Sequence, residues 1–80
     1  MMTLKIFLSS TLRMHVPSYD PDKGLETEIP VGTTVADLCR RINVPADEVA
    51  IIMADGRMRD LEFILDDAER IHLFPAIGGG

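Results

Sequence analysis

Hydrophobic and polar residues alternate along the start of the chain, over residues 3–9. Leu4, Ile6 and Leu8 fall on one side of an extended chain there, while Phe7 falls on the other side among polar neighbours. A period of two is typical of a β-strand with one face turned toward a core. The pattern therefore predicts a strand at this position.

Further strands are predicted between the turn segments. Residues 25–30 and 70–74 each predict one strand, the second closed by a proline. The continuous apolar run at residues 49–53 predicts a buried strand, and residues 57–61, after an Asp-Gly turn signal, predict a short edge strand. Proline, aspartate and glycine crowd residues 17–24, which predicts a loop.

One segment changes to a helical period. Thr34 is placed to cap a helix there, with Asp37 three residues later in a variant of the capping box. Asp37 also brings a negative charge to the first turn, where it is favoured, and Pro45 ends the segment. The apolar residues with the spacing of a helical stripe are Val35, Leu38, Cys39 and Ile42.

This order of elements predicts an α+β domain, with four to five strands in one sheet and one main helix. A single helix covers one face of a sheet, so the other face should be open. The alternation of the first and last strands puts Phe7, His72 and Phe74 on that open face.

Composition and charge narrow the classes of function. The chain is 46% hydrophobic and 26% charged, as expected of a globular domain, and its net charge of -5 argues against binding nucleic acid or an anionic membrane. The one cysteine, Cys39, excludes an internal disulfide and fits a small buried thiol. No stretch has the length of a membrane span or the form of a signal peptide, so we expect a cytoplasmic protein.

The end of the sequence is its most informative segment. Gly78, Gly79 and Gly80 follow directly on the last strand, and glycines in a row are poor at packing. A frayed terminus is one interpretation. The other is a flexible arm that presents the Gly80 carboxylate to the pocket of another protein. In either case, we expect a domain at residues 1–75 and a flexible tail at residues 76–80.

The ending Leu73-Phe74-Pro75-Ala76-Ile77-Gly78-Gly79-Gly80 resembles that of the ThiS/MoaD family of ubiquitin-like sulfur carriers. Residues 31–38 resemble the family's turn into its helix, and residues 65–71 resemble the loop before its final strand. The resemblance covers nearly the whole chain, and its length and the Phe-Pro pair favour the MoaD branch. It implies a β-grasp fold with a mixed sheet, in which the first and last strands are neighbours.

The resemblance also implies a mechanism that is centred on Gly80. A ThiF/MoeB-type adenylating enzyme would use ATP and magnesium to convert the Gly80 carboxylate into an acyl-adenylate. A sulfur donor would then displace AMP and leave a thiocarboxylate. A sulfur-accepting synthase or larger subunit would take the sulfur into a cofactor, of molybdopterin type first and thiamine thiazole next. The chain would be a co-substrate and not an enzyme, with no cofactor or metal of its own.

The candidate residues for binding a partner are Phe7, Phe74, Met58, Pro75 and Ile77. Scattered surface hydrophobes are the plainer interpretation of the phenylalanines, whereas an aromatic pair beside a reactive tail suits docking. Two alternative functions remain open. The chain could be a ubiquitin-like modifier that is conjugated through Gly80, or a β-grasp interaction module with an inert tail.

Overall fold

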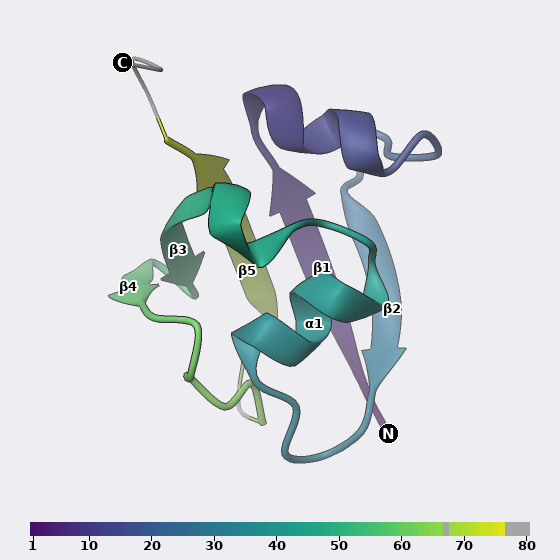
Figure 1. Ribbon diagram of the computed structural model, residues 1–80. Helices are drawn as coiled ribbons and strands as arrows, with labels where there is room; N and C mark the ends of the chain where they lie inside the picture. Colours follow the sequence, from purple (N-terminus) through teal and green to yellow (C-terminus); the bar gives the residue numbers. More distant parts are fainter. Residues whose placement is uncertain (67, 77–80) are drawn as a thin grey trace.

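The computed structural model describes residues 1–66 and 68–76, which form one mixed sheet with a helix packed on one face (Figure 1). The five strands follow the order β2-β1-β5-β3-β4, and β1 and β5 are parallel neighbours at the centre. The predicted α+β class is therefore confirmed. The elements are β1 (Met2–Leu8), η1 (Ser10–His15), β2 (Leu25–Ile29), α1 (Val35–Arg41), η2 (Ala46–Glu48), β3 (Val49–Ala54), β4 (Arg57–Arg59) and β5 (Arg70–Pro75).

The core lies between the sheet and α1. Leu4 and Ile6 of β1 are fully buried, as are Ile71 and Leu73 of the neighbouring β5. Helix α1 lies in front of these central strands in Figure 1, and its residues Val35, Leu38 and Cys39 are likewise fully buried. The alternation in β1 and the helical stripe thus meet in one core, as the sequence predicted.

Helix α1 begins with the predicted capping box. The hydroxyl of Thr34 accepts the backbone N–H of Asp37 at 3.1 Å, and the Asp37 carboxylate accepts the backbone N–H of Thr34. These hydrogen bonds lower the pKa of the Asp37 carboxyl group, and the one from the Thr34 backbone has the largest effect. The helix ends before Asn43, whose φ of 63° is left-handed, so the chain turns toward β3.

A 3₁₀-helix at Ser10–His15 follows β1, in a segment whose hydrophobic residues show no clear period. Its residue Leu12 is fully buried, and the backbone N–H of Ser9 just before it donates to the Leu73 carbonyl at 3.1 Å. The predicted loop at residues 17–24 folds back, and the Tyr19 hydroxyl accepts the N–H of Leu8 at 2.9 Å. Tertiary contacts therefore fix a segment that has no periodicity of its own.

The prediction that residues 49–53 form a buried strand is wrong in one respect. Ile52 and Ala54 of β3 are buried, but Ile51 is 38% exposed and Met53 is only half-buried. The reason is that α1 covers one face of the sheet only. The register with β5 also shifts between Val49 and Ile51, which marks a β-bulge there.

Across residues 1–66 and 68–76, no helix combines the length and the apolar character that crossing a membrane requires.

Candidate functional site

Strand β5 is the middle strand of the sheet and also the last strand before the C-terminal residues. It runs parallel to β1 and finishes at Pro75, and Ala76 after it is exposed. The predicted tail residues Ile77, Gly78, Gly79 and Gly80 lie outside the described residues. The structure therefore tests the surroundings of the tail and not the tail itself.

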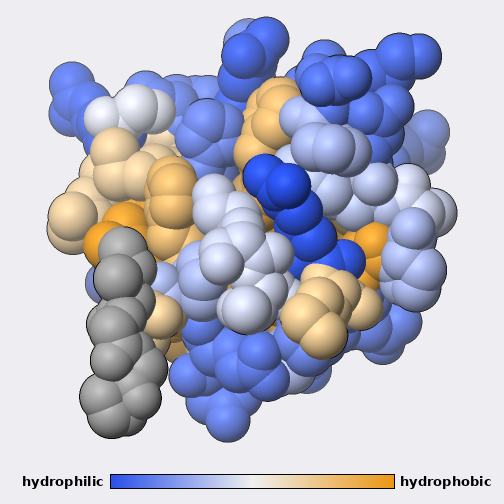
Figure 2. Space-filling model, turned by 90° about the horizontal axis from the view of Figure 1, so that it is seen from above, coloured by the Kyte–Doolittle hydropathy of each residue, from blue (hydrophilic) through white to orange (hydrophobic). Residues whose placement is uncertain are grey.

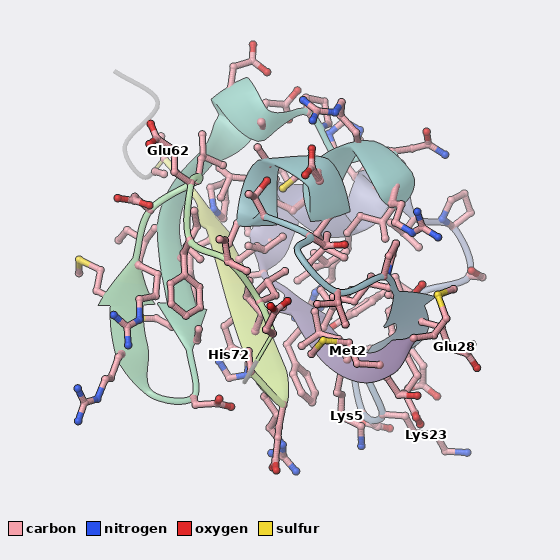
Figure 3. The ribbon with its side chains drawn as sticks, turned by 90° about the horizontal axis from the view of Figure 1, so that it is seen from below. Met2, Lys5, Lys23, Glu28, Glu62 and His72 are labelled. Carbon is pink, nitrogen blue, oxygen red and sulfur yellow. The ribbon has the colours of Figure 1, made fainter. Side chains whose placement is uncertain are left out.

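The face of the sheet turned away from α1, here called the open face, carries one row of side chains across four strands. Phe7 of β1 is the register partner of His72 on β5, and His72 is also the partner of Met53 on β3. Met53 in turn faces Met58 on β4. Figure 3 shows His72 on the side of the sheet opposite α1. Side chains of facing residues in register lie on the same face, so these four are neighbours.

Aromatic contacts hold the centre of this row. The rings of Phe7 and His72 meet edge to face with centroids 4.8 Å apart, and the rings of His72 and Phe74 do so at 6.1 Å. The guanidinium carbon of Arg70 lies 5.9 Å from the centroid of the Phe7 ring. The predicted proximity of the two phenylalanines on the open face is thus found, with His72 between them.

A glycine makes room for the Phe7 ring. Gly24, just before β2, has a φ of 75°, which L-residues with a side chain rarely adopt. A Cβ atom there would lie 2.9 Å from the carbonyl oxygen of Ile6 and 3.0 Å from Cε1 of Phe7. The absence of a side chain at Gly24 therefore leaves room for the Phe7 ring beside the start of β2.

The second row on the open face lies nearer the end of β5. Ile51 is the register partner of Phe74, and both stand on the face away from α1. Pro75, one residue on, pairs with Val49, which packs against the core, so Pro75 faces the α1 side. Figure 2 shows this end of the molecule, where hydrophobic residues gather on one side. We define the open-face apolar patch as Phe7, Ile51, Met53, Met58 and Phe74.

Sequence reasoning found three of the five patch residues and missed two. Phe7, Phe74 and Met58 lie where they were predicted, and Met58 is 69% exposed. Ile51 and Met53 were assigned to a buried strand. Ile51 and Met53 are two residues apart, so both lie on the face of the strand opposite to Ile52. The continuous apolar run at residues 49–53 gave no polar residue that would mark this second face as exposed.

A small hollow of about 160 Å³ lies beside the patch, lined by Met53, Asp55, Gly56, Arg70 and His72. The Asp55 carboxylate accepts the backbone N–H of Arg70 at 3.0 Å and that of Glu69 at 3.2 Å. It is thereby engaged in holding the β3–β4 turn against β5. The Asp55 carboxylate that lines this hollow is therefore already used in stabilising the fold.

Two further side chains of reactive types, Cys39 and His15, are buried or hydrogen-bonded within the fold. Cys39 is fully buried, and desolvation raises the pKa of its thiol, which makes it a poor nucleophile. His15 lies 2.9 Å from a carboxylate oxygen of Glu48 and joins η1 to η2. Among the described residues, histidine, cysteine, aspartate and glutamate form no group of three that could hold a metal ion.

The sheet order, the single helix and the strand that leads to a glycine-rich end define a ubiquitin-like β-grasp protein. A sequence model of the family described as Mut7-C ubiquitin matches residues 1–78. The chain therefore belongs to the Mut7-C ubiquitin family, and the ubiquitin-like class expected from the sequence is confirmed.

A solved structure supports the same fold. The crystal structure of SAMP1 from Haloferax volcanii aligns with a TM-score of 0.68, at 16% sequence identity, over 99% of this chain and 100% of that one. At this identity the likeness establishes the fold. No curated protein matches the sequence.

Proposed function

We propose that this protein is a sulfur carrier that works through the carboxyl group of Gly80. A partner enzyme of the ThiF/MoeB type binds the open-face apolar patch and activates the carboxylate. The product is a C-terminal thiocarboxylate, which delivers sulfur to a synthase or larger subunit. Molybdopterin-type cofactor synthesis is the favoured pathway, and thiamine thiazole synthesis is the next.

The observation that carries this proposal is the continuity of β5. The same strand contributes His72 and Phe74 to the open face and then leads, through Ala76, to the glycines. Residues 76–80 span about 16 Å when extended. A partner that binds the patch therefore has Gly80 within reach of a pocket of its own.

Glycine suits the end of such an arm for two physical reasons. It has no Cβ atom, so a narrow channel can close around the chain, and its carbonyl carbon is unhindered toward attack. The proposal requires that the mature chain end at Gly80 with a free carboxylate. Mass spectrometry of the C-terminal peptide from the protein purified from its own host tests that requirement.

The proposed chemistry has three steps. The Gly80 carboxylate attacks the α-phosphate of magnesium-bound ATP in the partner enzyme, which forms an acyl-adenylate and releases pyrophosphate. A sulfur donor of the persulfide class then attacks the acyl carbon and displaces AMP. Reductive cleavage of the resulting acyl disulfide by a thiol leaves the thiocarboxylate. The chain contributes an electrophile and a docking surface, so we propose that it is a co-substrate and not an enzyme.

Reconstitution with an adenylating enzyme from the same host tests the proposal. The assay follows AMP release with magnesium-ATP and a persulfide donor, and thiocarboxylate formation by mass spectrometry. Deletion of Gly80 should abolish the product. Phe74→Ala should lower the rate of adenylation, because it removes an aromatic ring from the patch.

Met14→Ala is the matched control for Phe74→Ala. Met14 is 78% exposed and lies on η1, which is not part of the sheet. Its replacement should leave the rate unchanged. Equal rates for the Phe74 and Met14 variants would contradict the docking surface, and lysine conjugates without a thiocarboxylate would favour the protein modifier.

A further inference from the structure

Two thioethers and an imidazole stand side by side on the open face, from three adjacent strands. Met58 on β4 faces Met53 on β3, and Met53 faces His72 on β5. We propose that Met53, Met58 and His72 form a binding site for a soft monovalent metal ion, namely copper(I), for which silver(I) is a probe. This inference does not depend on the chemistry of Gly80.

The β-turn between β3 and β4 brings the two methionines close together. Asp55 and Gly56 have φ angles of 50° and 84°, as in a type I′ turn, and Ala54 pairs with Arg57 next to them. The next pair, Met53 and Met58, is then a non-hydrogen-bonded pair, in which Cα atoms lie about 4.5 Å apart and side chains are closest. Both sulfur atoms can therefore approach one ion above the sheet.

His72 completes the row from the other side of Met53. Its ring is held between Phe7, at a centroid distance of 4.8 Å, and Phe74, at 6.1 Å. These contacts restrict the ring and limit the entropy that is lost when it binds an ion. Met53 and His72 also line the hollow of about 160 Å³, which is open to an ion. Met58, which is 69% exposed, lines a separate hollow with Arg59, Asp60 and Phe63, so its side chain has to turn toward Met53 to share that ion.

The chemistry of the three ligands selects the ion. Thioethers are soft ligands that suit copper(I), and imidazole suits copper as well, whereas calcium and magnesium need oxygen ligands. The Asp55 carboxylate nearby is engaged with backbone N–H groups at 3.0 Å and 3.2 Å. Three uncharged ligands beside the cation of Arg70 favour a single positive charge over a double one.

The other sulfur and nitrogen groups lie elsewhere in the fold. Met1 is exposed at the start of the chain, and Met2 packs against the core. The thiol of Cys39 is fully buried in the core. His15 contacts Glu48 at 2.9 Å on the 3₁₀-helices, and Met14 is exposed on η1. Substituting these residues one at a time therefore distinguishes metal binding on the open face from metal binding elsewhere.

Silver(I) titration of the full chain, observed by NMR of ¹³C-methyl-labelled methionine, tests the proposal. We expect saturable binding of one ion, with shifts of the Met53 and Met58 methyl signals and an unchanged Met14 signal. Copper(I), kept reduced by ascorbate and competed with a chelator, should give the same shifts. Zinc(II) at equal concentration should leave them in place.

The variants are chosen to preserve the fold. Met53→Leu and Met58→Leu conserve volume, and circular dichroism verifies folding. The double variant should lose the one-ion binding and His72→Gln should weaken it, while Met14→Leu and Cys39→Ala should bind as the parent does. Binding that survives the double replacement, or that is lost with Cys39→Ala, would overturn the proposal. So would Met53 and Met58 signals that stay unmoved by stoichiometric silver.

Discussion

Replacing Gly24 by alanine tests the packing of the open face directly. At the φ of 75°, an L-residue is strained by about 1–2 kcal/mol. Part of this cost, about 0.4–1 kcal/mol, is offset because alanine restricts the unfolded chain. The added Cβ atom also meets the Ile6 carbonyl oxygen at 2.9 Å and the Phe7 ring at 3.0 Å. Overpacking of this kind costs a further amount of about 1–3 kcal/mol.

Gly56→Ala is the matched control. Gly56 has a φ of 84°, but a Cβ atom there would meet nothing within 4 Å. The two variants share the backbone strain, so their difference in the free energy of unfolding isolates the contact with Ile6 and Phe7. Since about 1 kcal/mol shifts the Tm of a domain this size by about 4–8 °C, Gly24→Ala should melt at least about 4 °C below Gly56→Ala.

Thermal and urea denaturation, followed by circular dichroism, measure this difference. The NMR signals of His72, whose ring lies 4.8 Å from that of Phe7, should also shift in Gly24→Ala and not in Gly56→Ala. Equal stability of the two variants, with unchanged His72 signals, would refute the account of how the Phe7 ring is placed.

Three further predictions concern α1. Thr34→Ala removes the cap and should lower the free energy of unfolding by about 1 kcal/mol in urea denaturation; an unchanged value would contradict the capping role. Because folding lowers the pKa of Asp37, the charge stabilises the fold above the ordinary value of 3.8, and this stabilisation is lost as pH falls through the folded pKa. Asp37→Asn should therefore be less stable than the parent at neutral pH, and urea denaturation in increasingly acidic buffers should show the two converging; a constant gap would contradict this. Cys39 should react with a disulfide reagent only on unfolding, so the rate should rise with urea; immediate reaction in the native protein would show that the thiol is accessible.

Most of the fold followed from local patterns in the sequence. The alternation of Leu4, Ile6 and Leu8 and the capping of α1 by Thr34 depend on neighbouring residues alone, and both are found. The open face at Phe7 followed from the same alternation, because one helix can cover only one face of a sheet. Elements with a clear period were thus predictable without knowledge of their tertiary contacts.

The features that escaped prediction depend on distant partners. The 3₁₀-helix at Ser10–His15 is anchored through Leu12 and has no period of its own. The outward position of Ile51 depends on which face of β3 the helix covers, and the bulge before it depends on pairing with β5. Pro75 was grouped with the docking residues, but the alternation of β5 turns it to the other face.

The central claim is that Gly80 carries sulfur, and mass spectrometry of the protein purified from its own host tests it most directly. Fragmentation must locate the change, because oxidation of any of the five methionines adds nearly the same mass as the exchange of oxygen for sulfur. The account predicts a C-terminal peptide that ends at Gly80 with sulfur in place of one carboxyl oxygen. A peptide that ends in an unmodified carboxylate, even after incubation with the host's adenylating enzyme, ATP and a sulfur donor, or a chain that continues beyond Gly80, would contradict it.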